Sequence, residues 1–228
     1  MGIIERKERE KEQRKEEIIN AAERIFQEKG LSATTMDEIA EAAELGKSTL
    51  YLYYKSKEDL YLVVTCRGGD ILHSMFLEAA GTDEPSVKQI QNIGDAYINY
   101  FNQHRKYYRM YYFLENSELH KQVSPEMADL CAQNDKRIWG IVFDTIKRAK
   151  EDGYLKEDVH PPEAAVMFWA CAYGLMRQID RAEDMWREQM GVELTTACKK
   201  AMALLLEGMM TDKGKRVYEE LNMSRVNN

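Results

Sequence analysis

The residues that most often carry out chemistry in proteins stand far apart in this sequence. The cysteines and histidines lie at positions Cys66, Cys131, Cys171, Cys198, His73, His104, His120 and His160. No two cysteines form a CxxC pair, and no spacing suits a zinc site. The sequence also contains no glycine-rich phosphate loop, nucleophile elbow or HExxH helix. We therefore expect buried, reduced thiols, no metal, no cofactor and no catalysis.

One short segment gathers ammonium, hydroxyl and phenol groups. Gly46–Lys57 contains three lysines and no acidic residue. A helix over residues 47–54 places Leu50 and Tyr54 inward and leaves the polar side chains outward. Such groups contact phosphates and base edges of DNA. The predicted DNA-contacting residues are Thr35, Lys47, Ser48, Thr49, Tyr51, Tyr53 and Lys57.

The residues before this segment predict the elements that position it. From Ile18 onward, apolar residues recur at helical spacing, and Gly30 is expected to end that helix. Thr35 and Glu38 have the spacing of a capping box, which begins a helix of about two turns. Residues 44–46 form a tight turn before the third helix. Two short helices joined by such a turn describe a helix-turn-helix, whose second helix enters the major groove.

Residues 5–17, which precede these helices, alternate acidic and basic side chains. Two interpretations remain open. The segment is either a solvated helical extension held by ion pairs four residues apart, or an arm that touches DNA.

Helical patterns continue to the end of the sequence. The chain has only 4 Pro and 13 Gly, too few for the turns of an all-β protein. We expect an all-α fold in which the polar segment 212–228 frays. The remaining helices are expected at 56–80, 87–104, 106–116, 125–152, 161–190 and 193–210.

Composition excludes several other classes of protein. The chain of 228 residues is 44% hydrophobic and 31% charged, as in ordinary globular proteins. Its longest apolar run is Ala164–Met176, whereas a membrane helix needs about 20 apolar residues. The N-terminal charges are not followed by the apolar stretch of a secretory signal. We therefore expect a cytoplasmic protein without a membrane partner. The net charge of −7 leaves DNA binding to the local positive charge of Gly46–Lys57.

Residues 18–60 carry a spaced set of residues that can be compared with known families. The set is Ile18-Ile19, Ala21-Ala22, Phe26, Gly30, Thr34-Thr35, Ile39-Ala40, Thr49-Leu50-Tyr51, Tyr53-Tyr54 and Lys55-Ser56-Lys57-Glu58-Asp59-Leu60. With these residues the segment resembles the N-terminal domain of the TetR family of transcriptional regulators. The chain departs from the family at Glu44, where Gly is usual, at Gly46, where Ser or a similar residue is usual, and at Tyr54, where Phe is usual.

This resemblance implies an all-α protein of nine or ten helices in total. Residues 1–56 would form the arm and a three-helix helix-turn-helix DNA-binding domain. Residues 57–228 would form a larger helical ligand-binding and dimerisation domain, with 57–80 as the linker helix. Family members act mostly as repressors that a small-molecule effector releases from a palindromic operator on double-stranded DNA. The effector moves the linker helix, and the two DNA-binding heads of the homodimer leave register.

The second domain is rich in aromatic side chains, which suits an apolar or aromatic effector. No cluster of charges in the sequence predicts a charged effector. Each of these side chains fits either a pocket wall or the ordinary core, and both interpretations stay open. The predicted pocket residues are Tyr97, Phe101, Tyr108, Tyr111, Trp139, Phe143, Met167 and Phe168.

Two apolar stripes at helical spacing predict the dimer interface, because small residues among large ones let helices of a bundle approach closely. Packing inside a single chain is the alternative for each stripe. The first stripe contains Ala165, Trp169, Ala172, Tyr173 and Met176. The second contains Ala201, Leu204, Leu205, Gly208 and Met209.

Two other functions remain possible from the sequence. One is a DNA-binding regulator that answers to a protein partner or activates transcription. The other is an all-α enzyme that carries an N-terminal helical bundle, and the lack of any catalytic motif counts against it.

Overall fold

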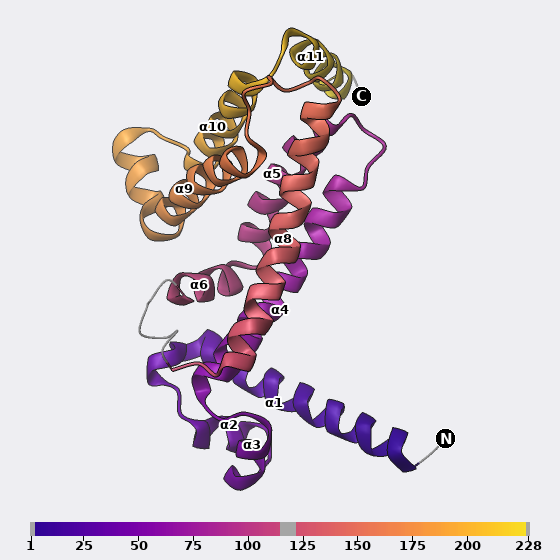
Figure 1. The fold of residues 1–228 in the computed structure, drawn as a ribbon. Coiled ribbons are helices and arrows are strands. Elements are labelled where there is room, and N and C mark those ends of the chain that lie inside the picture. Colours follow the sequence, from indigo (N-terminus) through magenta and orange to yellow (C-terminus); the bar gives the residue numbers. More distant parts are fainter. Residues whose placement is uncertain (1–2, 115–121, 227–228) are drawn as a thin grey trace. The chain divides into compact units, whose positions relative to one another are not determined.

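The computed structural model describes residues 3–114 and 122–226. Within these residues every named element is a helix, and Leu155 and Met210 form the one antiparallel bridge. The all-α prediction is confirmed, although residues 115 and 116 of the helix expected at 106–116 lie outside the described ranges. Figure 1 shows the ten helices of the described residues: α1 Ile3–Ala33, α2 Met36–Ala42, α3 Lys47–Tyr53, α4 Lys57–Ala80, α5 Ser86–Gln103, α6 Arg105–Leu114, α8 Pro125–Glu151, α9 Pro161–Met190, α10 Leu194–Met209 and α11 Asp212–Val226.

Proline and glycine set several of these helix boundaries. Pro125 begins α8 and Pro161 begins α9, because proline fits the first helical turn, where its missing N–H is not needed. Gly191 follows α9 in the left-handed conformation, with φ of 63°. Gly30, with φ of 74°, interrupts the helical geometry of α1 near its C-terminal end. Ala182 interrupts α9 in a similar way, with φ of −152°.

The chain divides into two compact units by its internal contacts. Unit 1 contains Met1–Asp70 and His104–Asp135, and unit 2 contains Ile71–Gln103 and Lys136–Asn228. Helices α4 and α8 contribute residues to both units. The functional division expected between residues 56 and 57 stays a prediction, because a compact unit is not by itself a functional domain.

Helices α1 to α4 share one apolar core in unit 1. Ile18, Ile39, Leu50 and Leu60 come from the four helices in turn, and each is completely buried. Burial of apolar surface is the dominant force in folding. Because the core draws on all four helices, it holds the short helices α2 and α3 against α1 and α4.

Polar contacts also fasten α1 to α4 inside unit 1. The Arg67 guanidinium of α4 donates to Asn20 Oδ1 at 2.7 Å and lies 2.9 Å from Glu23 Oε2 and 2.6 Å from Glu16 Oε2. Tyr107 of α6 donates its hydroxyl to the same Glu23 at 2.6 Å. Arg67 thus binds three side chains of α1 at once.

Helices α5, α8, α9, α10 and α11 contribute to the core of unit 2. The segment 212–226, which we expected to fray, forms α11 instead. Tyr218 is buried in the core, and Lys213 donates to the backbone oxygen of Asp152 at 2.6 Å. A Cβ atom at Gly214 would lie only 2.2 Å from the backbone oxygen of Tyr154. Glycine therefore lets α11 approach this turn closely.

The expectation of buried thiols holds for two of the four cysteines. Cys66 and Cys198 are buried, Cys131 and Cys171 are half-buried, and all four are free thiols. In the described part of the chain, no three potential metal ligands gather as a metal site would require. None of the helices described is both long enough and apolar enough to span a bilayer.

Candidate DNA-binding surface and effector pocket

A complete capping box begins α2, as the sequence predicts. Thr35 Oγ1 accepts a hydrogen bond from the backbone N–H of Glu38, and the Glu38 carboxylate accepts one from the backbone N–H of Thr35 at 2.8 Å. Lys29 of α1 also donates to this carboxylate. Hydrogen bonds from Lys29 and then Thr35 lower the pKa of Glu38 from 4.5 to about 2. The box fixes the start of α2 and ties it to α1.

The turn between α2 and α3 has two unusual positions. Glu44 adopts a left-handed conformation with φ of 54°, which is uncommon for a residue with a Cβ atom. Gly46 is the N-cap of α3 and provides no side-chain hydrogen bond to the helix. Ser, Thr, Asp and Asn are the residues that usually satisfy the free N–H groups at this position. Both departures from the TetR pattern thus have local structural consequences.

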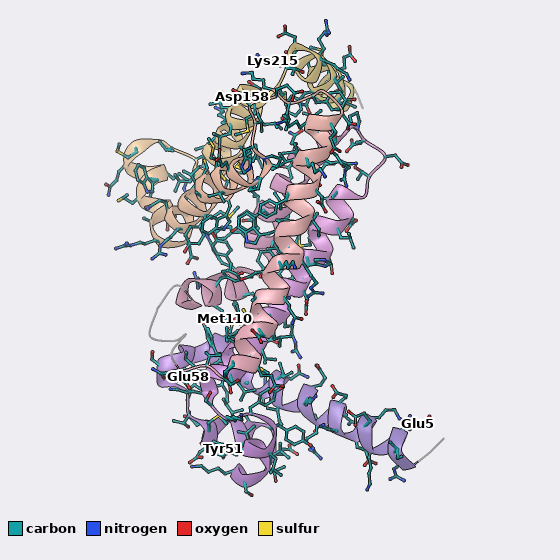
Figure 2. All side chains as sticks on the ribbon, in the orientation of Figure 1. Glu5, Tyr51, Glu58, Met110, Asp158 and Lys215 are labelled. Atoms are coloured by element: carbon teal, nitrogen blue, oxygen red, sulfur yellow. The ribbon has the colours of Figure 1, made fainter. Side chains whose placement is uncertain are left out.

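One face of helix α3 packs on the core, and the opposite face is exposed to solvent. Leu50 is completely buried and Tyr54 is 8% exposed, so they fix the helix on the core of unit 1. Lys47, Ser48 and Tyr51 are exposed on the outer face, where Figure 2 labels Tyr51. Backbone N–H groups at the start of α3 add to this surface, and such groups favour anions.

Thr35, Thr49 and Tyr53, which we also predicted to contact DNA, are either hydrogen-bonded within the protein or partly buried. The exposed Thr35 already uses its hydroxyl in the capping box, where it donates to Glu38 at 2.8 Å. Thr49 is half-buried, and Tyr53 packs partly against the core. Their assignment to the DNA surface stays a prediction.

Two of the predicted lysines have partners inside the protein. Lys47 lies 2.7 Å from Asp37 Oδ1 of α2, in an exposed ion pair. Lys57 is half-buried and donates to the backbone oxygens of Leu31 at 3.0 Å and Thr34 at 2.9 Å. An ammonium group has three donors, so Lys57 retains one for a phosphate. Lys57 therefore holds the end of α1 whether or not it also contacts DNA.

Leu52 is a candidate contact that the sequence interpretation missed. Its side chain lies on α3 and is 84% exposed, more than Tyr51 at 44%. An apolar side chain in the major groove can contact the methyl group of thymine. Its position two residues from the buried Leu50 is the signal that places it on the outer face.

The charged arm of α1 is helical, and acidic neighbours pair with several of its basic residues. Arg6 lies 2.8 Å from Glu10, Arg14 lies 2.8 Å from Glu17, and Lys15 lies 2.7 Å from Glu12. Figure 2 shows the side chains around this helix from Glu5 onward. These contacts fit the solvated helical extension, while DNA contact by the arm stays untested.

The predicted pocket residues belong to both units and make several separate packing contacts. In unit 1, Tyr108 is buried and Tyr111 donates a hydrogen bond to Asp135. In unit 2, Tyr97 packs against Phe76, with ring centroids 6.2 Å apart, and Phe101 is 1% exposed. These four positions fit the core interpretation as well as the pocket interpretation.

The other four predicted pocket residues lie on α8 and α9 of unit 2. Trp139 and Phe143 stack with ring centroids 5.5 Å apart. Met167 is 49% exposed, whereas Phe168 is buried. The assignment of these eight residues to a pocket stays a prediction.

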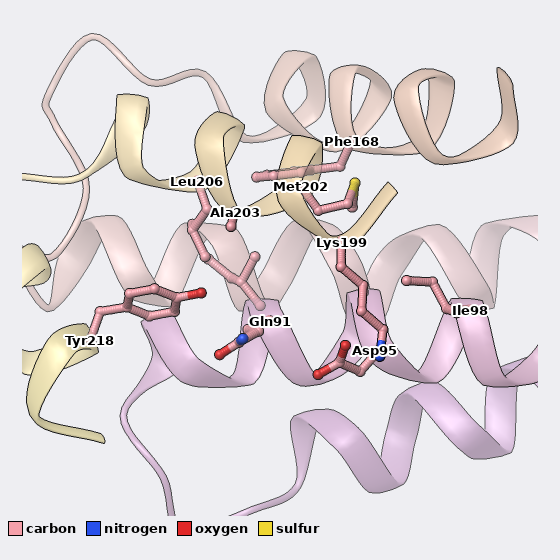
Figure 3. Close-up of a pocket in the computed structure, with 11 residues that line it drawn as sticks. Gln91, Asp95, Ile98, Phe168, Lys199, Met202, Ala203, Leu206 and Tyr218 are labelled. Carbon is pink, nitrogen blue, oxygen red and sulfur yellow. The ribbon is translucent and has the colours of Figure 1, made fainter. Parts of the chain in front are cut away.

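A small pocket does lie within unit 2, between α5, α9, α10 and α11 (Figure 3). Its volume is about 90 Å³. Phe168 lines it, and the other seven predicted residues do not. The lining residues are Ile90, Gln91, Gly94, Asp95, Ile98, Phe168, Lys199, Met202, Ala203, Leu206 and Tyr218.

The predicted dimer residues divide into buried and exposed groups. Ala165, Ala172 and Met176 are each 1% exposed within the single chain, so they contribute to its own core. Trp169 is 38% exposed, Leu204 is 69% exposed and Gly208 is also exposed. Tyr173, Ala201 and Leu205 are half-buried. The exposed members leave an apolar surface on α9 and α10 that one chain does not cover.

The helix-turn-helix of unit 1 can be compared with known proteins on its own sequence. Residues 18–64 match the family described as bacterial regulatory proteins, tetR family. Residues 18–64 therefore form a TetR-family DNA-binding domain. The matched range spans the capping box, the turn and the outward face of α3.

Two curated TetR-type relatives are similar over part of their lengths. The transcriptional activator FasR of Mycolicibacterium smegmatis is 28% identical over 138 residues, which cover 60% of this chain and 61% of FasR. The negative regulator IcaR of the biofilm operon icaADBC in Staphylococcus aureus strain Newman is 28% identical over 141 residues, which cover 60% of this chain and 75% of IcaR.

Solved TetR-type structures share the fold over most of the chain. The fatty acid degradation regulator FadR from Bacillus halodurans has a TM-score of 0.63 at 19% identity, with 85% of this chain and 98% of FadR covered. SmeT, the repressor of the Stenotrophomonas maltophilia efflux pump SmeDEF, has a TM-score of 0.62 at 18% identity, with 86% and 90% covered. The family match of residues 18–64 marks the chain as a DNA-binding transcriptional regulator.

Proposed function

We propose that this TetR-family protein is a repressor that binds a palindromic operator as a homodimer and leaves it when a small, largely apolar molecule binds. The outward face of α3 carries this proposal, because Lys47, Ser48 and Tyr51 are exposed there on a helix fixed by the core. We expect the protein to act in the cytoplasm, where its DNA is.

A dimer is expected because one short recognition helix reads only a few base pairs. Two-fold symmetry would present two such helices to half-sites about 34–36 Å apart. The exposed apolar surface of α9 and α10 supports this assembly. Val166, Trp169 and Leu204 are 50%, 38% and 69% exposed there, and apolar patches of this kind mark interaction sites.

The dimer proposal can be tested at the most exposed position. Leu204→Glu would place a charge in the interface without disturbing the core, so we expect light scattering to give a monomer mass. Trp169→Glu should act in the same way. Leu77→Glu is the matched control, because Leu77 is 57% exposed on α4. A dimer mass for both Trp169→Glu and Leu204→Glu would show that this surface is not the dimer interface.

The direction of regulation needs a separate experiment. An operator can first be selected from random duplex DNA with the purified protein and then placed before a reporter gene. Repression lowers reporter output when the protein is present, and an effector restores it. Increased output would instead support activation, the activity named for FasR. Control by a protein partner would leave the purified protein unresponsive to any small molecule.

A further inference from the structure

The pocket of unit 2 has one polar wall and one apolar wall. Gln91 and Asp95 lie four residues apart on α5, so they face the pocket side by side. Phe168, Met202 and Leu206 from α9 and α10 line the opposite wall. A ligand held here would meet polar groups along one side and hydrocarbon along the other.

A hydrogen bond from Lys88 fixes the orientation of the Gln91 side-chain amide. The buried Lys88 donates to Gln91 Oε1 at 2.6 Å and to Asn222 Oδ1 at 2.7 Å. An ammonium group can only donate, so the amide oxygen must face Lys88. The amide NH₂ of Gln91 is then directed away from Lys88, and it offers the pocket a hydrogen-bond donor.

Two side chains of opposite charge line the polar side of the pocket. Asp95 extends from α5 and Lys199 from α10, and Figure 3 shows the two side chains pointing toward one another. A ligand with one charge would satisfy one of these groups and separate it from the other. A zwitterion can pair with both, because each of its charges finds an opposite charge in the wall.

The size of the pocket limits what can enter. A water-sized group needs about 10–15 Å³ of such volume, so about 90 Å³ holds about six to nine groups. Drug-sized ligands need about 300–1,000 Å³. Valine and isoleucine have few enough non-hydrogen atoms to fit six to nine groups, whereas molecules with several rings have too many.

We propose that this pocket binds a small zwitterion with a branched aliphatic chain, of the size and chemistry of valine or isoleucine. The ammonium group pairs with Asp95, and the carboxylate pairs with Lys199 and accepts from the Gln91 amide. The aliphatic chain packs against Phe168 and Met202. Its role as the effector rests on the proposed repressor function, but the binding itself does not.

The first test is calorimetric titration of the whole protein. We expect isoleucine to bind at least tenfold more tightly than isovalerate, which lacks the ammonium, and isopentylamine, which lacks the carboxylate. Asp95→Asn and Lys199→Gln should each weaken isoleucine binding about tenfold, because each removes one charged hydrogen-bond partner. Lys200→Gln, at an adjacent exposed residue on α10, should leave binding unchanged.

The second test narrows the pocket without removing a polar group. A Cβ atom at Gly94 would lie 3.6 Å from Met202 Cε, so Gly94→Ala places a methyl group at the pocket wall without a clash. Alanine also favours a helix more than glycine does. We expect an unfolding temperature at least as high as that of the wild type, with isoleucine binding weakened at least tenfold. Gly140→Ala is the control, since nothing lies within 4 Å of its added Cβ atom.

The outcomes separate this proposal from the proposed function. Equal binding of isoleucine, isovalerate and isopentylamine, or no binding of isoleucine, would overturn the zwitterion site, even if the protein still binds its selected operator as a dimer. A failure to bind any selected operator, with isoleucine still bound through Asp95 and Lys199, would overturn the repressor and leave the site standing. Isoleucine that binds without changing operator affinity would overturn its role as effector.

Discussion

Asp37 of α2 holds the ammonium group of Lys47 of α3 at a distance of 2.7 Å. The pair lies on the surface expected to face DNA, and its two side chains are 63% and 58% exposed. A phosphate that binds Lys47 must compete with the Asp37 carboxylate, which also repels it. Asp37 therefore limits the affinity of this surface for DNA.

We expect Asp37→Asn to tighten operator binding by up to about fivefold and no more, since an exposed ion pair is weak. Fluorescence anisotropy with the selected operator measures this change. Lys47→Gln should weaken binding, and adding Asp37→Asn to Lys47→Gln should recover little of the loss. An Asp37→Asn protein that binds no better than the wild type would show that the pair is not broken on DNA.

Lys57 combines a structural role with a predicted phosphate contact, and the two can be separated. Lys57→Ala removes hydrogen bonds to Leu31 and Thr34, so we expect the free energy of unfolding to fall by about 1–2 kcal/mol. The salt dependence of operator binding should also become shallower by about one unit. Lys55, exposed two residues earlier, is the comparison, because Lys55→Ala should leave stability unchanged. An unchanged salt slope for folded Lys57→Ala protein would leave Lys57 with its structural role alone.

Glu44 should be better replaced by glycine. Its φ of 54° is unfavourable for a residue with a Cβ atom, and glycine adopts it freely. We expect Glu44→Gly to raise the free energy of unfolding by about 0.5 kcal/mol, after the greater freedom of unfolded glycine is subtracted. The same change at Glu41, within helical α2, should lower it by about 1 kcal/mol. Urea denaturation of both variants measures the difference.

Acid should weaken the contact between α1 and α2 through Glu38. Its pKa in the folded protein is about 2, below the ordinary value of 4.5, because Lys29 and Thr35 hydrogen-bond the carboxylate. A lowered pKa contributes stability that is fully present above about pH 4.5 and is lost as the pH falls toward 2. Glu38→Gln should therefore flatten the decrease of unfolding temperature between pH 4.5 and 2. An identical decrease in both proteins would assign the acid sensitivity to other groups.

Local patterns in the sequence were sufficient for the helices before α11 and for the capping box of the candidate DNA-binding surface. Thr35 and Glu38 predict their capping box from spacing alone, and the boundaries at Pro125, Pro161 and Gly191 agree with the structure. These features depend on residues close in sequence, whose geometry the backbone fixes.

Contacts between distant residues could not be predicted in this way. Asp95 and Lys199 are about one hundred positions apart, so nothing in the sequence indicates that they line one pocket. The aromatic side chains could not be assigned from the sequence either, because a buried ring in a core and a ring in a pocket wall have the same helical spacing. The order of α11 depends likewise on a distant partner, the turn at Tyr154 that Gly214 approaches.

The Arg67 contacts described above join α1 to the first half of α4, so that the two helices would move together. Arg67 donates hydrogen bonds to Glu16, Asn20 and Glu23 of α1, while Lys57 donates to the backbone near the end of the same helix. A rotation of α4 would then turn the recognition helix without altering its surface. Release from the operator would then result only from a change in the spacing between the two recognition helices of the dimer. Binding to an isolated half-site should accordingly be as strong with effector as without it, while binding to the full palindrome is lost.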